Sequence, residues 1–164
     1  MDEIARRQRF VFLFAVVFYV TGAHASQSFV NYAAWQHIGI DTFAAYHHAM
    51  APRAGTWILL PRMLEIVLAV VVLRRRPTPL TRGALLLALA LAIVPLVSTI
   101  LIQRPIHGEL ERLGNTPELL GRLQDTNWFR LIPEWIRAGL YVWMASRLIS
   151  VAPEGAAKAI NSSS

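Results

Sequence analysis

The sequence predicts an all-α integral membrane protein, a four-helix bundle with short interfacial helices in its two outer loops. Hydrophobic residues make up 55% of the 164-residue chain, and charged residues make up only 16%. Four apolar runs cover about residues 10–37, 56–73, 83–103 and 128–149, and each is near the roughly 20 residues that cross a hydrocarbon core. We therefore expect one four-span domain over residues 1–150, with no room for a soluble domain.

The first run begins like a signal peptide, because three arginines precede it and Ala23-His24-Ala25 resembles a small-residue cleavage site. The apolar pattern nevertheless continues past Phe29 to Trp35. A signal peptide would end before that point, so we expect a retained first span.

The segment after the first span predicts a short interfacial helix over residues 41–50, with Asp41 as a candidate N-cap. One face of this helix combines residues at helical spacing: Phe43, Tyr46, His47 and Met50. Pro52 and Gly55 should end the helix before the second span begins.

The second and third spans should be joined by a short turn at Thr78-Pro79-Leu80-Thr81, as between antiparallel helices. In the second outer loop, Pro105 to Leu113 predicts one helix. Thr116 and Pro117 then supply an N-cap and a first-turn proline for another helix. Beyond the fourth span we expect a disordered cytoplasmic tail over residues 151–164.

The distribution of Lys and Arg predicts the orientation. Nine of these residues lie before the first span, in the turn around Thr78 or after the fourth span, whereas four lie in the two other loops. Both termini should therefore be cytoplasmic in a multi-pass protein of the cell (inner) membrane. The formal charge of +6 needs no nucleic-acid partner, because the basic residues lie where membrane insertion places them.

The chain has no cysteine. Disulfides, thiolate metal sites and the thiol chemistry of four-helix quinone-linked oxidoreductases are therefore excluded. Any redox chemistry must come from a metal, a bound cofactor or the substrate.

Two apolar runs are interrupted by charge, the second by Arg62 and Glu65 and the fourth by Glu134 and Arg137. Ionisable groups in hydrocarbon cost several kcal/mol unless they are paired or hydrated. Both runs start on the outer side. Arg62 and Glu134 lie seven residues from those starts, and Glu65 and Arg137 lie ten. Opposite charges should therefore face each other at two depths, either as a structural ion-pair network or as a catalytic site.

Polar residues also form stripes at helical spacing, which should face the bundle interior. The fourth span carries Asn127, Arg130, Glu134, Arg137 and Tyr141. The first carries Thr21, His24, Gln27 or Ser28, Asn31 and Trp35, and the third carries Ser98, Thr99 and Gln103. For the small hydroxyl residues we expect hydrogen bonds between helices rather than chemistry.

Four of the five histidines fall in the outer loops. Because no HExxH spacing exists, a His-ligated transition metal would have to be assembled across the loops, with His47, His48, His107 and Glu109 as candidate ligands. The sequence leaves the cofactor open between such a metal and none. Adjacent His47 and His48 point about 100° apart on a helix, so only one should line a cavity, and we expect His47 to be the buried one.

Four motifs carry a resemblance to a known family: Phe29-Val-Asn-Tyr-Ala-Ala-Trp35, Phe43-Ala-Ala-Tyr-His47, Pro105-Ile-His-Gly-Glu-Leu110 and Thr126-Asn-Trp-Phe-Arg130, followed by Trp135 and Arg137. Over about residues 10–150 the chain resembles the anthrone-oxygenase-like proteins, small four-span membrane proteins known as domain of unknown function 1772. The resemblance implies a four-helix membrane bundle. For a few members it also implies an oxygenase that converts polycyclic anthrones to anthraquinones.

By this analogy a His or carboxylate removes an acidic proton, and Arg130, Arg137 and Asn127 stabilise the resulting anion. The catalytic candidates are His47, His107, Glu134, Arg130 and Arg137. The substrate-binding candidates are His24, Asn31, Tyr32, Trp35, Glu65, Asn127 and Trp128. Trp135 could also stack on a flat substrate, whereas Trp57 and Trp143 fit an interfacial aromatic belt, which is an alternative for Trp128 as well.

The leading hypothesis is thus an integral membrane oxidoreductase or oxygenase. It would act on a lipophilic, aromatic or quinone-like small molecule in an outward-opening intramembrane polar cavity. One alternative is a non-enzymatic binder or carrier of a lipid, quinone or haem, and another is a structural subunit of a membrane complex. The expected partners are the lipid bilayer and a lipophilic small molecule, and the oligomeric state is open.

Overall fold

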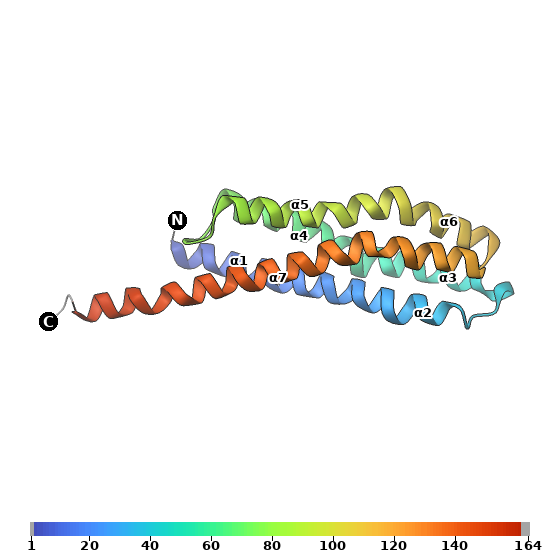
Figure 1. Cartoon of the computed structure of the whole chain (residues 1–164), viewed down its shortest axis with the longest axis horizontal. Coiled ribbons are helices and arrows are strands. Elements are labelled where there is room, and N and C mark those ends of the chain that lie inside the picture. The colour runs from blue at the N-terminus through green and yellow to red at the C-terminus, as the bar shows by residue number, and fades with distance from the viewer. Residues whose placement is uncertain (1, 162–164) are drawn as a thin grey trace.

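The computed structural model describes residues 2–161, with side chains described through residue 150. Four long helical segments run side by side in alternating directions, and none of the described residues forms a strand (Figure 1). The first segment is α1 (Glu3–Ser26), the π-helical turn η1 (Gln27–Asn31) and α2 (Tyr32–Trp35). The second is α3 (Ile40–Ala54), η2 (Gly55–Leu59) and α4 (Leu60–Arg74). The third is α5 (Arg82–Ser98), η3 (Thr99–Gln103) and α6 (Arg104–Leu113), and the fourth is α7 (Pro117–Asn161).

Three of these segments are long and apolar enough to cross a membrane: Glu3–Trp35, Ile40–Arg74 and Arg82–Leu113. The predicted all-helical class is confirmed, and the apolar segments indicate a membrane-embedded protein that contacts lipid. Large hydrophobic side chains are exposed around the bundle, among them Leu101 at 68%, Trp57 at 65% and Val11 at 63%, as expected of a surface that faces lipid rather than water.

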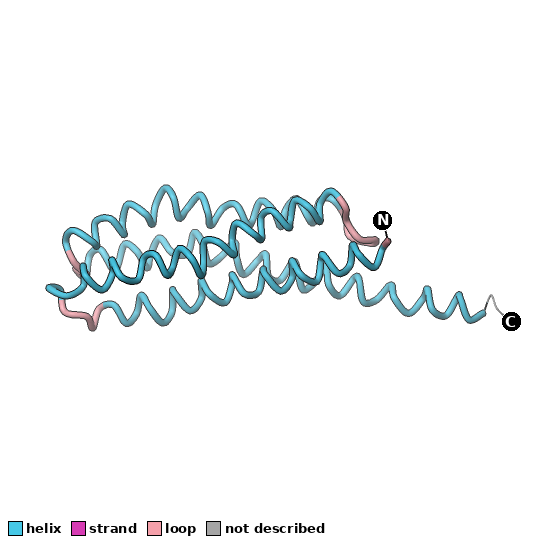
Figure 2. Tube along the Cα trace, turned by 180° about the vertical axis from the view of Figure 1, so that it is seen from behind, coloured by secondary structure: helices cyan, strands magenta, loops and turns pink. Residues whose placement is uncertain are grey.

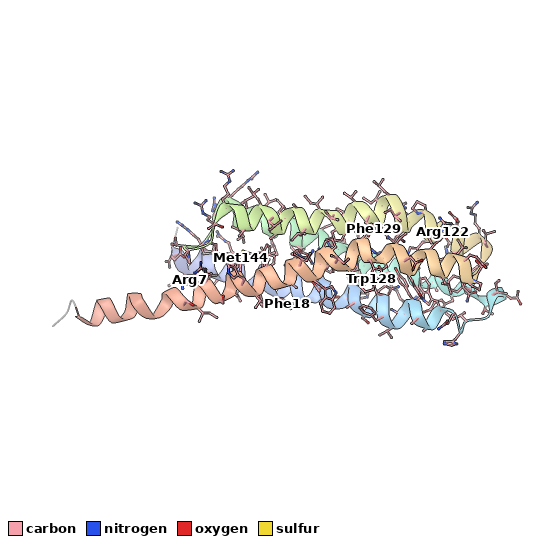
Figure 3. The ribbon with its side chains drawn as sticks, in the orientation of Figure 1. Arg7, Phe18, Arg122, Trp128, Phe129 and Met144 are labelled. Carbon is pink, nitrogen blue, oxygen red and sulfur yellow. The ribbon has the colours of Figure 1, made fainter. Side chains whose placement is uncertain are left out.

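Loops occupy only the ends of the bundle, as the backbone trace seen from behind makes plain (Figure 2). The chain's N-terminus and the turn between α4 and α5 lie at one end, which we call the inner end, and α7 extends past the other helices on that side (Figure 1). The connections from α2 to α3 and from α6 to α7 lie at the opposite, outer end. Arg7 and Arg122 mark the inner and outer ends in Figure 3.

The helix starts follow the sequence. The Asp2 carboxylate accepts from the Ile4 amide at 3.2 Å, and the Thr81 hydroxyl accepts from the Ala84 amide at 3.3 Å. The predicted cap at Thr116 is confirmed, because its hydroxyl accepts from the Leu119 amide at 3.4 Å and Pro117 begins α7. Side-chain oxygens thus bond the otherwise unpaired amides of these first turns.

The outer helices predicted at 41–50 and 105–113 are not separate elements. Pro52 and Gly55 do not end α3, which continues through η2 into α4, and α6 likewise continues η3. Gly55 has ordinary helical angles, φ −56° and ψ −47°. Prolines are tolerated in membrane helices. The carbonyl that Pro52 deprives of its usual amide donor is that of His48, whereas the Thr56 hydroxyl donates to the carbonyl of Pro52 itself at 3.0 Å.

Each of the three π-helical turns contains such a hydroxyl. Besides Thr56 in η2, Ser28 in η1 donates to the carbonyl of His24 at 2.7 Å, and Thr99 in η3 donates to that of Pro95 at 2.8 Å. A π-turn replaces bonds between residues four apart with bonds between residues five apart. Each of the three carbonyls also accepts a backbone N–H, so the hydroxyl adds a second hydrogen bond at the start of each turn.

Two apolar cores flank the middle of the bundle. The inner core consists of Phe10, Leu13, Val17, Ala69, Val72, Leu80, Leu85, Ala88, Tyr141, Met144 and Leu148. The outer core consists of Tyr32, Trp35, Phe43, Ile106, Leu110, Leu119, Leu120 and Leu123. Most of the buried polar residues lie between them, so both cores limit access of water to the polar layer.

The predicted disordered tail is helical where it is described. Helix α7 continues to Asn161, so the backbone of residues 151–161 extends the fourth segment, whereas residues 162–164 lie outside the described residues.

Candidate functional site

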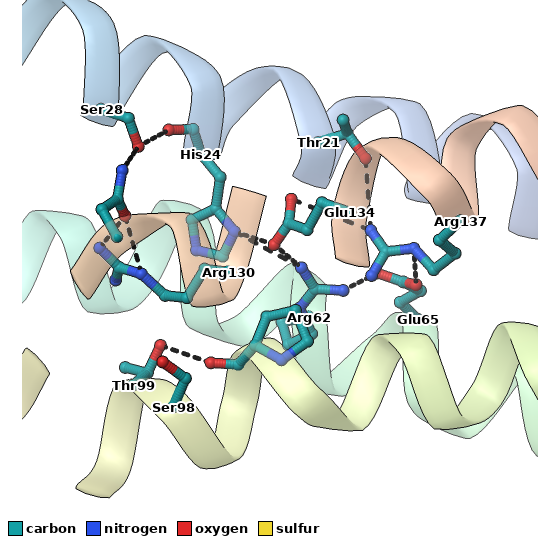
Figure 4. Close-up of polar contacts among 12 residues, drawn as sticks. Thr21, His24, Ser28, Arg62, Glu65, Ser98, Thr99, Arg130, Glu134 and Arg137 are labelled. Carbon is teal, nitrogen blue, oxygen red and sulfur yellow. Dashed lines mark hydrogen bonds and ion pairs between the residues drawn. The ribbon is translucent and has the colours of Figure 1, made fainter. Parts of the chain in front are cut away.

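Four buried charges link the second and fourth segments as the sequence predicted. Arg62 contacts the Glu134 carboxylate, and Arg137 Nε lies 3.1 Å from Glu65 Oε1. Arg62 Nη1 also donates to Glu65 Oε2 at 2.7 Å, and Arg137 Nη2 lies 4.0 Å from Glu134 Oε2. We call these four residues the charged quartet; its charges alternate around a closed ring (Figure 4).

Helix phase explains why the quartet forms. Residues three apart lie on the same face of a helix, so each helix presents one acid and one base towards the other. All four side chains are at most 2% exposed. Charges removed from water need partners to offset their desolvation. The quartet supplies two positive and two negative charges.

Two residues of the first segment, His24 and Thr21, contact members of the charged quartet. His24 Nδ1 contacts the same Glu134 oxygen as Arg62, and Thr21 Oγ1 accepts from Arg137 Nη2 at 3.3 Å (Figure 4). Glu134 is therefore held by groups from the first and second segments together, which fixes the position of its carboxylate.

A second polar group lies nearer the outer end. His47 Nε2 and His107 Nδ1 are 2.9 Å apart, and His107 Nε2 lies 3.3 Å from the Tyr32 hydroxyl. The same hydroxyl oxygen accepts from Arg130 Nη2 at 3.2 Å. We call His47, His107 and Tyr32 the histidine relay. Each comes from a different helical segment, and together they form a row of titratable groups joined by hydrogen bonds.

The relay has two self-consistent arrangements of its protons. Either each imidazole donates through Nε2, towards Tyr32, or the Tyr32 hydroxyl donates and each imidazole donates through Nδ1. In the first arrangement His47 Nδ1 offers a lone pair, and in the second it offers an N–H. Interconversion takes up one proton at His47 Nδ1, moves one proton along each bond towards Tyr32, and releases the proton that the Tyr32 hydroxyl carried, so the row can pass a proton between His47 and Tyr32.

Asn127 connects Arg130, which bonds the histidine relay, to the first segment. Its Oδ1 accepts from Arg130 Nε at 3.0 Å, and its Nδ2 donates to Ser28 Oγ at 2.6 Å. Ser28 is the residue that bonds the carbonyl of His24. Through Ser28, the η1 turn therefore joins Arg130 and the histidine relay to His24 and the charged quartet.

A cavity of about 270 Å³ lies against both polar groups. Its polar wall residues include His24, Tyr32, His47, Arg62, His107 and Arg130, and most of the remaining lining is apolar. Three of its lining residues, Ala51, Leu59 and Arg104, are exposed and belong to the second and third segments. The mouth therefore lies on the side of the bundle, between these segments.

All three π-helical turns contribute to the cavity, through Gln27 of η1, Gly55 of η2 and Thr99 of η3 among others. Several buried polar atoms in the wall have no partner among the described residues: Trp35 Nε1, His47 Nδ1 and Arg62 Nε. A buried donor without an acceptor is costly. Each of these three atoms is an unpartnered polar group of a residue that lines the cavity.

The cavity brings together only part of the predicted site. His47, His107 and Arg130 of the catalytic candidates line it, as do His24, Tyr32 and Trp35 of the substrate-binding candidates. The other candidates do not. Glu65, Glu134 and Arg137 belong to the charged quartet. Asn127 bonds Arg130, and Asn31 donates to Gln27 Oε1 at 2.8 Å.

Trp128 and Trp135 point away from the cavity. They are 53% and 58% exposed, because each lies one residue beyond an inward-facing position of α7. On a helix that step turns a side chain by about 100°. Their position fits the lipid-facing surface, as does that of Trp57 and Trp143.

The predicted metal ligands do not converge, and the described residues contain no group of three or more His, Asp or Glu side chains that could hold a metal ion. His47 is 4% exposed, as predicted, and pairs with His107. His48 faces outward to Glu111 at 3.1 Å, and Glu109 pairs with Arg122 at 2.8 Å. The described residues therefore show no metal site among these candidates, which were His47 or His48 from one loop with His107 and Glu109 from the other.

Sequence reasoning missed Arg62 as a wall residue, and it missed Gln27, Met50 and Arg104 as lining. Arg62 belonged to the predicted quartet, and its position three residues before Glu65 gave no sign that it would also line the cavity. Met50 was placed on the correct face with His47. Nothing in the periodicity marks Arg104.

Comparisons with protein families, curated proteins and solved structures find no match to this chain. The functional argument therefore rests on the geometry of the cavity and its wall.

Proposed function

We propose that this protein is a membrane-embedded oxidoreductase of the oxygenase type that acts on a lipophilic, aromatic small molecule within the cavity. The observation that supports this most is the histidine relay in the wall of a largely apolar cavity whose mouth is on the lipid-facing side. A small apolar site with a few convergent polar groups is the usual form of a ligand site. The resemblance to anthrone-oxygenase-like proteins agrees with this assignment.

In this proposal α7 is the fourth membrane span, and both termini are cytoplasmic. Its charged residues Glu134 and Arg137 are fully buried and paired, while Ile132 and Ile136 are more than half exposed. Paired charges facing the bundle interior are compatible with a span. The inner end carries the Arg-rich turn between α4 and α5, which supports a cytoplasmic position of this end by the positive-inside rule.

The substrate enters from the bilayer between the second and third segments. The cavity volume of about 270 Å³ is near the lower end of the roughly 300–1,000 Å³ typical of ligand sites, so the substrate is a small molecule rather than a whole phospholipid. Trp35 and Tyr32, both about 2% exposed with ring centroids 4.9 Å apart, offer flat apolar surfaces for an aromatic ring.

Chemistry begins at His47 Nδ1, the relay nitrogen with no partner among the described residues. In the arrangement that leaves a lone pair there, His47 removes a proton from a carbon acid or phenol, and Arg130 stabilises the anion. Dissolved O₂ is the oxidant. A CH₂ group becomes C=O by losing two hydrogens, and O₂ supplies one oxygen atom to the carbonyl and the other to water.

The test uses purified full-length protein with anthrone, and measures O₂ uptake and anthraquinone formation. His47→Gln should lower the rate by about 10²–10⁴-fold, the usual contribution of a general base. His48→Gln is the matched control, because His48 lies next in the chain but its side chain is 84% exposed. Absence of turnover in the wild-type protein, or equal losses in the two variants, would contradict the enzyme assignment.

A carrier of a lipophilic aromatic molecule is the second candidate, favoured by the internal bonding of the relay. His107 uses both ring nitrogens within the protein, one towards His47 and the other towards Tyr32. Anthrone that binds stoichiometrically and is recovered unchanged in the presence of O₂ would support the carrier over the enzyme.

A further inference from the structure

The buried charges of the described residues do not balance. Three buried arginines, Arg62, Arg130 and Arg137, share the interior with two buried carboxylates, those of Glu65 and Glu134. Both carboxylates belong to the charged quartet, where they pair with Arg62 and Arg137. Arg130 is therefore left over, although only 6% of it is exposed.

The contacts of Arg130 are all neutral. Its Nε donates to Asn127 Oδ1 at 3.0 Å, its Nη2 donates to the Tyr32 hydroxyl at 3.2 Å, and its Cζ lies 5.9 Å from the centre of the Tyr32 ring. Within the described residues no carboxylate lies in ion-pair distance of it. Glu134, one turn further along α7, is committed to His24 and Arg62.

An arginine stays protonated even when buried, so this side chain brings an uncompensated positive charge into a site with little water. Such a charge is among the costliest groups to bury in a membrane protein, and its usual explanation is an ion or ligand that completes the pair. Arg130 lines the cavity. The space beside it is therefore where the missing negative charge belongs.

We propose that the cavity binds a monoanionic amphiphile, an aromatic carboxylate or phenolate, whose charged oxygen pairs with Arg130. This inference rests on the cavity of the proposed function and specifies the substrate class that it takes. The planar fork of the guanidinium suits a carboxylate or phenolate oxygen. Arg104, exposed at the mouth, places a second positive charge on the path of an entering anion.

The test compares 2-naphthoate with 2-naphthamide, which have the same ring and similar shape but differ in charge. Binding to the purified full-length protein in neutral detergent is followed by calorimetry. The wild-type protein should bind naphthoate at least about thirtyfold more tightly than naphthamide, as expected when one partner of a buried charge pair is removed. Arg130→Gln should remove this preference by weakening naphthoate binding and leaving naphthamide binding unchanged.

Arg122→Gln is the matched control, because Arg122 lies on the same helix but pairs with Glu109 at the exposed outer end. It should leave both affinities unchanged. Equal affinity of the wild-type protein for the two compounds would overturn the anion preference and leave the cavity as a binding site. Failure to bind either compound would instead overturn the binding site itself. The wild-type comparison decides the matter even where Arg130→Gln does not fold.

Discussion

Replacing Glu134 by Gln should expose the energetic coupling within the charged quartet. Glu134 is fully buried and lies near two arginines, Arg62 and Arg137. Its removal leaves Arg62 and Arg137 sharing Glu65, at 2.7 and 3.1 Å. Stranding a buried charge costs about 3–5 kcal/mol. Because Glu65 still contacts both arginines, we expect the lower end of that range, about 3 kcal/mol.

The alternating ring makes the double variants informative. Glu134→Gln with Arg62→Gln leaves the neutral pair of Glu65 and Arg137, so this double variant should be more stable than Glu134→Gln alone. Glu134→Gln with Glu65→Gln leaves two unpaired arginines and should be the least stable. Whether the second substitution raises or lowers the stability of the Glu134→Gln variant therefore depends only on charge balance.

The measurement is thermal unfolding in detergent, followed by circular dichroism. A loss of about 3 kcal/mol corresponds to a decrease in Tm of roughly 6–12 °C for a chain of this size. The control is Arg122→Gln, which breaks a pair whose arginine side chain is 55% exposed, and exposed pairs contribute at most about 1 kcal/mol. Strictly additive losses in the two double variants would refute the coupling.

Two further predictions concern the bundle ends. For topology, cysteines introduced at Thr78 and at His37, both exposed in a chain that has no cysteine of its own, should react with impermeant reagents from opposite sides of the membrane; reaction from the same side would refute the four-span arrangement. For stability, Asn115→Ala should destabilise the outer end by about 1–3 kcal/mol in thermal unfolding, the cost of leaving buried carbonyls unbonded, because Asn115 Nδ2 donates to the carbonyls of Trp35 and Ile38 at 2.7 Å each. An unchanged Tm would show that these bonds contribute nothing.

Periodicity predicted the inward stripes and the quartet because both depend only on helix phase. Asn127, Arg130, Glu134, Arg137 and Tyr141 are all at most 6% exposed. The order of acid and base on two helices that start at the same level was enough to pair them. No long-range information was needed for that result.

Helix ends were harder to predict for a physical reason. Pro52 and Gly55 would end many helices in water, where freed backbone groups bond solvent. Here the helix continues through both residues, from α3 through η2 into α4. A proline rule taken from soluble proteins therefore overestimates how often a membrane helix stops.

The cavity wall could be predicted only in part. Its position depends on how far the second and third segments separate near η2 and η3, which no residue pattern encodes. Arg104 and Arg62 line the cavity, although one is exposed and the other belongs to the charged quartet. The candidate metal ligands were grouped by loop alone, and in the structure His48 and Glu109 pair instead with Glu111 and Arg122.

The three π-helical turns give the outer third of the bundle an unusual sensitivity to chain length. Each turn accommodates one residue more than a regular helix would need, so the residues beyond it are rotated by about 100° relative to an uninterrupted helix. Tyr32 follows η1, His47 precedes η2 and His107 follows η3. Deleting one residue within η1 would return the first segment to regular phase and turn Tyr32 away from His107. Over evolutionary time this protein should therefore accept substitutions in these turns more readily than it accepts single-residue gaps.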